Sequence, residues 1–129
     1  RGTDNPFTVA GHPDYTNYKF SFIPRSMPGA KEPKYKDKTC FGIDFTEPNW
    51  GGDKPLEYIH IDLIRELFKN YPTKDAFFTD FFNQLIGNAT VKEDIIKGNV
   101  SDKIRFSWQK EVGDFKAIRK KYLLYKDFE

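Results

Sequence analysis

The hydrophobic period of the sequence changes once, close to residue 55, and this change limits the possible folds more than any other feature. After it, apolar residues recur every three or four positions, which is the period of an amphipathic helix. Before it, short aromatic and β-branched runs indicate strands at Phe7 to Val9, Lys19 to Ile23 and Thr39 to Phe45. Strands followed by helices predict an α+β fold, with a small N-terminal sheet and C-terminal helices packed against it.

Start and stop signals divide the second part of the chain into four predicted helices. Pro72 ends the first helix just after Tyr71, and Gly87 caps the second. Thr90 and Glu93 fit a capping box for the third, which closes at Gly98, and Ser101 caps the fourth. We expect the apolar stripes of these helices to form the core: Ile59, Leu63, Leu67, Phe68; Phe78, Phe81, Phe82, Leu85; and Ile104, Trp108, Val112, Phe115, Ile118, Tyr122.

Length and composition predict one domain over residues 1–129 and exclude several classes of function. The chain has the size of a common single domain, and its thirteen Phe residues can fill one compact core. A net charge of only +2 argues against nucleic acid as a partner. Cys40 is the only cysteine, so no internal disulfide is possible, and no apolar run approaches the roughly 20 residues of a membrane span. We expect neither a cofactor nor a bound metal.

The first seven residues form the most promising candidate site. Arg1, Thr3, Asp4 and Asn5 place a guanidinium, a hydroxyl, a carboxylate and an amide in one short loop before Pro6 fixes a turn. Such a loop can bind a polyol such as a sugar. The alternative is that the short polar side chains satisfy their own turn backbone while Arg1 frays as a chain end.

A second candidate is the segment Gly11 to Tyr15, in which His12 and Asp14 lie beside an aromatic ring. His12 can contact a sugar or assist proton transfer, but a turn with a solvated histidine is the simpler interpretation. The basic run from Lys116 to Lys121 can attract an anion, although a solvated helix face explains it equally well. We find no nucleophile elbow, phosphate loop or pair of carboxylates spaced as acid and base.

A series of short motifs recurs along the whole chain. They are Arg1-Gly2-Thr3-Asp4-Asn5-Pro6-Phe7, Gly11-His12-Pro13, Pro28-Gly29, Cys40-Phe41-Gly42-Ile43, Leu67 to Pro72, Phe82 to Gly87, Ile95 to Gly98, Ile104 to Trp108 and Phe115 to Tyr125. In this order they resemble the C-terminal domain of the exo-β-N-acetylmuramidases (NamZ-type), long catalogued as a domain of unknown function. The chain departs from that pattern at Asp14-Tyr15, where the family commonly has Trp after Gly-x-Pro.

The resemblance implies a two-domain parent protein whose N-terminal, Rossmann-like domain carries the catalytic carboxylate. It implies an active cleft where the domains meet, release of N-acetylmuramic acid from peptidoglycan fragments, and a secreted or periplasmic location. On this view the chain is an accessory domain that carries no catalytic residue. It would bind the substrate through Arg1, Thr3, Asp4, Asn5 and His12. Its partners are the catalytic domain and muramic-acid-containing fragments.

Two other functions remain open from the sequence. A free-standing carbohydrate- or cell-wall-binding module would use exposed rings of Tyr15, Tyr18, Tyr35 and Trp50 as a stacking platform. A structural or protein-interaction domain would instead show an apolar patch that its partner covers.

Overall fold

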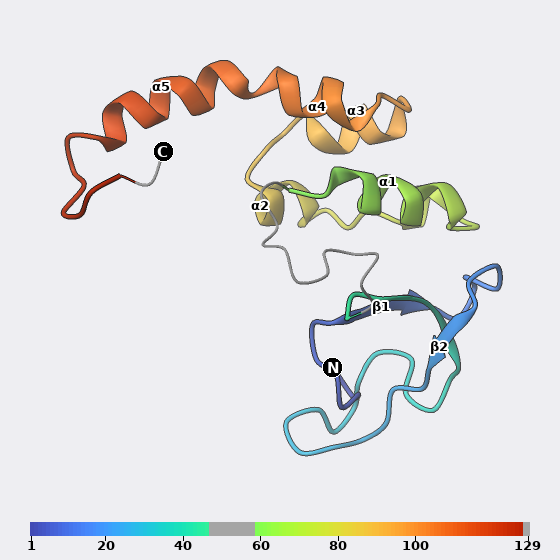
Figure 1. Ribbon diagram of the computed structural model, residues 1–129. Coiled ribbons are helices and arrows are strands. Elements are labelled where there is room, and N and C mark those ends of the chain that lie inside the picture. Colours follow the sequence, from blue (N-terminus) through green and yellow to red (C-terminus); the bar gives the residue numbers. More distant parts are fainter. Residues whose placement is uncertain (47–58, 128–129) are drawn as a thin grey trace. The chain divides into compact units, whose positions relative to one another are not determined.

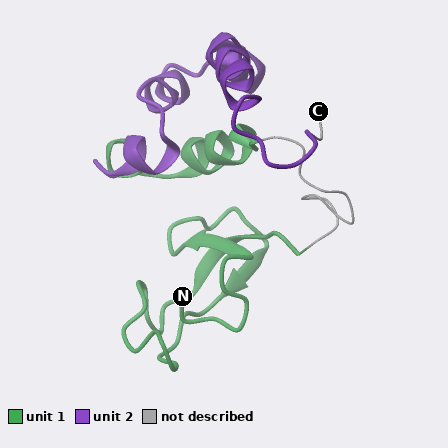
Figure 2. Ribbon diagram, turned by 90° about the vertical axis from the view of Figure 1, so that its left-hand side faces the viewer, with its two compact units in different colours: residues 1–77 green, residues 78–129 purple. Residues whose placement is uncertain are grey.

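The computed structural model describes residues 1–46 and 59–127 and contains two compact units, residues 1–77 and residues 78–129 (Figure 2). The first unit carries a three-stranded antiparallel sheet and helix α1, and the second carries further helices (Figure 1). The predicted α+β fold is therefore confirmed. The single domain expected over residues 1–129 stays a prediction.

The sheet is formed by β1 (Val9–His12), β2 (Phe20–Phe22) and β3 (Cys40–Asp44), with β3 in the centre. Gly42 of β3 pairs with Gly11 of β1, and a Cβ atom on Gly42 would lie 2.6 Å from the Gly11 Cα. Two strand backbones approach closely here, which is a common reason for a glycine inside a strand. The first strand begins later than predicted because Phe7 has a φ of 68°, which takes it out of the extended region.

Helix α1 (Ile61–Asn70) has Tyr71 as its C-cap, immediately before Pro72, as the sequence predicts. Ile61 is fully buried, whereas Ile59 precedes the helix and is exposed. A short 3-10 turn, η2 (Lys74–Ala76), follows. From it, the Lys74 ammonium donates to the main-chain carbonyls of Phe68 and Tyr71, so a positive charge satisfies acceptors at the C-terminal end of α1.

The second unit contains α2 (Phe82–Ile86), α3 (Val91–Ile96), α4 (Ser101–Ser107) and α5 (Gln109–Arg119). Gly87 ends α2 in the left-handed region, as predicted, although α2 is too short to include Phe78 and Phe81. The capping box predicted for α3 is wrong: the Asn88 side chain, instead of Thr90, accepts from the N–H groups of Thr90 and Val91 at 2.8 and 3.2 Å.

The long helix predicted after Ser101 is interrupted at Trp108, whose φ of −102° and ψ of 0° are not helical. Ser101 is the buried first residue of α4, and Val100 holds the N-cap position that was predicted for Ser101. Ile104 is buried as expected. The predicted core role of Val112, Phe115, Ile118 and Tyr122 is wrong, because these four residues are exposed. The break at Trp108 separates α5 from α4, the helix that buries Ile104. None of the described helices is long and apolar enough to cross a membrane.

Candidate functional site

The N-terminal loop, defined here as residues 1–8, has a backbone fixed by the rest of the first unit. The Arg25 N–H donates to the Gly2 carbonyl at 2.7 Å, and a Cβ atom on Gly2 would lie 2.6 Å from Pro33 Cγ. Gly2 is buried and has a φ of 82°, so glycine is required here both for space and for conformation. At the other end of the loop, the Thr8 hydroxyl donates to the Asn5 carbonyl at 3.1 Å.

The polar side chains of residues 1–5 have unused hydrogen-bonding capacity. Within residues 1–46 and 59–127, the side chains of Arg1, Asp4 and Asn5 make no hydrogen bond, and all three residues are exposed. Thr3 is half-buried, and its Oγ1 is shielded from solvent without a partner in the same part of the chain. The turn bond at Asn5 comes from its main chain. The alternative in which the polar side chains satisfy their own turn is therefore wrong for the described residues.

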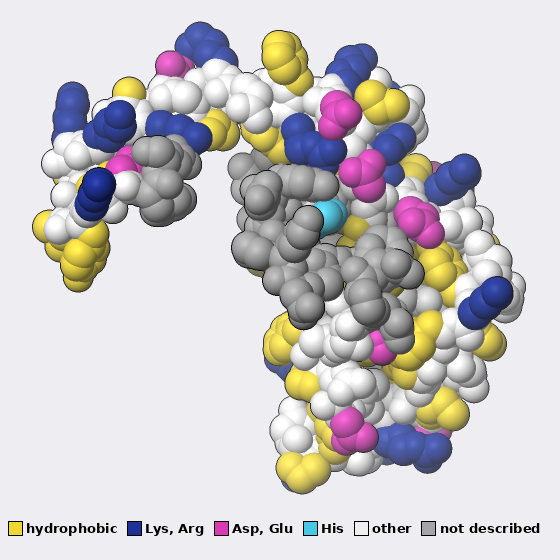
Figure 3. All heavy atoms as spheres, viewed as in Figure 1, with side chains coloured by type: hydrophobic (Ala, Val, Ile, Leu, Met, Phe, Trp, Pro, Cys, Tyr) yellow, Lys and Arg dark blue, Asp and Glu magenta, His cyan; other side chains and the backbone are white. Residues whose placement is uncertain are grey.

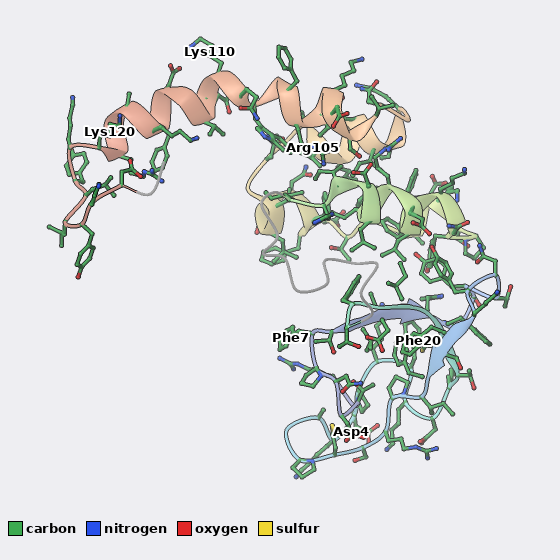
Figure 4. The ribbon with its side chains drawn as sticks, in the orientation of Figure 1. Asp4, Phe7, Phe20, Arg105, Lys110 and Lys120 are labelled. Carbon is green, nitrogen blue, oxygen red and sulfur yellow. The ribbon has the colours of Figure 1, made fainter. Side chains whose placement is uncertain are left out.

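Phe7 ends the loop as an exposed aromatic residue in a strained conformation. It is 95% exposed and projects from the edge of the first unit, while Asp4 lies elsewhere on the same loop (Figure 4). Its φ of 68° places a bulky residue in the left-handed region, which costs on the order of 1–2 kcal/mol. Residues with strained backbone cluster at functional sites, and no local sequence pattern predicts this conformation at Phe7.

His12, at the end of β1, is enclosed by tyrosine rings and is not solvated as the simpler sequence interpretation expected. Its side chain is 15% exposed, and the rings of Tyr35, Tyr71 and Tyr15 lie edge-on at centroid distances of 4.6, 4.8 and 5.9 Å. The Asp14 N–H donates to Nδ1 at 3.2 Å, and the Tyr71 hydroxyl lies 3.3 Å from Nε2. Both ring nitrogens of His12 are thus engaged within the chain.

Burial of the ring lowers the pKa of His12 from its ordinary value of about 6.5. The Asp14 carboxylate, 3.5 Å from Nδ1, opposes this effect, while the positive charge of Lys34 reinforces it. A neutral ring with its proton on Nε2 fits both contacts, because Nδ1 accepts from Asp14 and Nε2 then donates to Tyr71. His12 is therefore suited to hold structure at neutral pH.

Tyr15 and Tyr18 bind helix α1 and do not form the exposed stacking platform that the sequence suggested. Tyr15 is 4% exposed, and its hydroxyl donates to the Leu67 carbonyl at 2.8 Å. The Tyr18 hydroxyl donates to Glu66 Oε1 at 3.2 Å and accepts from Asn70 Nδ2 at 3.0 Å. Burial raises the pKa of both hydroxyls, so both stay protonated donors. Of the other two members of the platform, Tyr35 packs on His12, and Trp50 lies outside the described residues.

The N-terminal loop and His12 both contact the segment that connects β2 to β3. Pro33 packs on Gly2, and Tyr35, two residues later, packs on His12. Strand β1 nevertheless separates His12 from Thr8 by about 13 Å, at 3.3 Å per residue. The structure therefore brings Arg1, Thr3, Asp4 and Asn5 together in one loop and assigns His12 to a separate aromatic cluster. Among the described residues, no group of three or more His, Cys, Asp or Glu side chains is placed to hold a metal ion.

Reasoning from sequence missed the residues that enclose His12 and Tyr15. Tyr71, Leu67 and Asn70 follow these positions by more than 50 residues, and no local pattern links them. Tyr35 has a φ of 59°, which a residue other than glycine rarely adopts and which the sequence does not announce. Only the packing of α1 shows that these side chains belong to one cluster.

Comparison with known proteins relates the whole chain to one family. The model of the C-terminal part of the exo-β-N-acetylmuramidase NamZ matches residues 1–125. The crystal structure of a DUF1343 family protein from Bacteroides fragilis matches with a TM-score of 0.83 and 37% sequence identity, covering 98% of this chain and 36% of that one. The chain thus spans about a third of the length of that solved protein. The comparison with curated proteins gives no match. The chain belongs to the NamZ exo-β-N-acetylmuramidase family, as its C-terminal domain.

Proposed function

We propose that the chain is the accessory domain of an exo-acting β-N-acetylmuramidase, a glycoside hydrolase of peptidoglycan. In this proposal it completes a substrate cleft whose chemistry is supplied by an N-terminal, Rossmann-like catalytic domain. The observation that carries the proposal is the family match over residues 1–125, combined with a coverage of only 36% of the solved relative. That coverage leaves about two thirds of the relative for other functions, catalysis among them.

The N-terminal loop is the part of this domain that we assign to the substrate. A sugar is recognised by fixed donors and acceptors, and a fixed backbone reduces the entropy lost on binding. The bond from Arg25 to Gly2 and the packing of Pro33 supply the fixed backbone. Asp4 and Asn5 supply exposed polar groups whose bonds within the described chain remain unmade. Phe7, 95% exposed, adds an apolar ring to the same loop.

The loop does not contain the groups that hydrolysis needs. A glycosidase places two groups about 5–10 Å apart around the scissile bond, or uses a substrate group as one of them. Asp4 is the only carboxylate in residues 1–8, and it is exposed. We therefore assign Asp4 to binding or to assisting the chemistry of the other domain, and not to the role of general acid.

The test uses the longer protein that carries both domains, with a chromogenic N-acetylmuramic acid glycoside as substrate. Asp4→Asn and Asn5→Ala should each raise KM by about 3- to 10-fold with little change in kcat, because one net hydrogen bond contributes roughly 0.5–1.5 kcal/mol. Asp80→Asn and Asn83→Ala are the matched controls, since both residues are exposed and lie in the second unit. These controls should leave KM unchanged.

Three results would contradict the proposal in different ways. Hydrolysis by the present chain alone, at a rate near that of the longer protein, would place the catalytic groups within residues 1–129. A large fall in kcat for Asp4→Asn would make Asp4 catalytic. Amide NMR shifts of the chain alone in millimolar muropeptide, together with unchanged KM values for both variants, would favour a free-standing binding module.

A further inference from the structure

The second unit ends in a set of apolar side chains that lie at its surface. Val112, Phe115 and Ile118 follow a helical spacing on α5, and the segment after it adds Tyr122, Leu124 and Tyr125. We call these six residues the C-terminal apolar surface. Their exposed fractions are 39, 61, 54, 76, 89 and 86%. Hydrophobic side chains stand at the surface along and beyond α5 (Figure 3).

The area of this surface is that of an interface. A large apolar side chain offers roughly 150–250 Å², so the exposed fractions correspond to an area on the order of 700 Å². The largest apolar patch of a typical monomer is about 300–600 Å², whereas a stable protein interface buries about 800 Å² on each partner. The summed exposed area of these six residues is therefore close to what one partner of a stable interface buries.

The surface has a defined conformation that does not depend on its own apolar side chains. Arg119, the last residue of α5, pairs with Asp127 at 2.8 Å, and the side chains are 25% and 17% exposed. The Tyr122 N–H donates to the Arg119 carbonyl at 2.9 Å, which continues the turn after α5. These bonds fix the segment that carries Leu124 and Tyr125, and a preformed surface loses less entropy when it binds.

Several exposed lysine side chains lie on the same segment as this surface. Lys116, Lys120, Lys121 and Lys126 are exposed, and Lys110 near the start of α5 pairs with Asp114 at 2.7 Å (Figure 4). Apolar residues inside a charged, solvated rim are the arrangement found in protein interfaces. A partner that covers the apolar residues would need acidic groups opposite Lys120 and Lys121.

We infer that the C-terminal apolar surface docks on the N-terminal domain of the same protein. The family match runs through Tyr125 and so includes all six residues, which makes the surface part of the family domain and not an appended tail. The solved relative has about two thirds of its length outside this domain, enough chain to supply the partner. A covalently attached partner also meets the surface at a high effective concentration. This inference rests on the proposed function, which supplies the N-terminal domain.

Hydrogen exchange tests the inference, measured on the present chain and on the longer protein that contains it. Amides in residues 109–125 should exchange at least tenfold more slowly in the longer protein. The double variant Phe115→Gln with Leu124→Gln should remove that protection. The matched control is Phe106→Gln with Leu85→Gln, because these residues are 80 and 72% exposed and lie on α4 and α2. Neither pair should change the melting temperature of the present chain by more than about 2 °C.

Several outcomes would overturn the inference, and each differs from a failure of the proposed function. Equal exchange of residues 109–125 in both proteins would show that the N-terminal domain does not cover them. Protection of the present chain that increases with its concentration would identify a second copy as the occupant. Binding to phosphatidylglycerol-containing vesicles that the Phe115→Gln and Leu124→Gln changes abolish, without protection in the longer protein, would identify a lipid surface. The KM effects of Asp4→Asn and Asn5→Ala are independent of all three results.

Discussion

The hydrogen bond from Tyr15 to helix α1 should be a principal source of stability in the first unit, and Tyr15→Phe isolates it. The hydroxyl donates to the Leu67 carbonyl at 2.8 Å, and Tyr15 is only 4% exposed. The Tyr71 N–H donates to the Phe68 carbonyl, so the Leu67 carbonyl depends on Tyr15 for a partner from outside the helix. Phenylalanine keeps the ring contacts with Tyr18 and Tyr71 and removes only the donor.

The expected loss follows from the partly buried position of this hydrogen bond. A net hydrogen bond contributes about 0.5–1.5 kcal/mol, and an acceptor left buried without a partner costs about 1–3 kcal/mol. We therefore expect Tyr15→Phe to lower the free energy of unfolding by about 2 kcal/mol, which corresponds to roughly 30-fold in the folding equilibrium and a fall in Tm of roughly 5–10 °C.

Urea denaturation of the chain, followed by circular dichroism, measures this loss. Tyr125→Phe is the matched control, because the same hydroxyl is removed from a residue that is 86% exposed. The control should change stability by less than about 0.3 kcal/mol. A loss for Tyr15→Phe no greater than that of the control would refute the reasoning, since it would mean that water replaces the hydroxyl or that the bond contributes nothing.

Three further predictions concern other parts of the molecule. Gly42→Ala should destabilise the chain by on the order of 3 kcal/mol, because its Cβ would meet the Ala10 carbonyl oxygen. Gly113→Ala should stabilise α5 by about 0.5–1 kcal/mol, because no atom lies within 4 Å of the new Cβ. The urea midpoints of the two variants check both signs. Folding lowers the pKa of His12, so the unfolded chain takes up a proton first as the pH falls through about 6.5. The free energy of unfolding should therefore decrease as the pH falls below that value. His12→Gln should flatten this decline between pH 7.5 and 5.5, and an unchanged slope would show that other groups cause it. Lys74→Gln should cost about 1 kcal/mol through loss of the cation at the end of α1, visible as faster amide exchange in its last turn.

The sequence by itself determined those features that depend on neighbouring residues. Pro72 ends α1 because proline cannot continue a helix, and Gly87 ends α2 because glycine adopts the left-handed region without strain. The alternation before residue 50 located β2 and β3, whereas β1 begins later than predicted. The polar composition of residues 1–5 also identified the loop that the structure fixes on Pro33. These are local effects, and they act on any chain with the same short pattern.

The tertiary structure alone decided which of those local features are covered. Spacing marked Phe115 and Ile118 as core, but burial depends on whether another segment packs on them, and both residues are exposed. The local sequence predicted a solvated His12, but the hydroxyl of Tyr71, 59 residues later, contacts its Nε2 atom. Such contacts depend on how distant segments pack, and periodicity describes only which side of one segment is apolar.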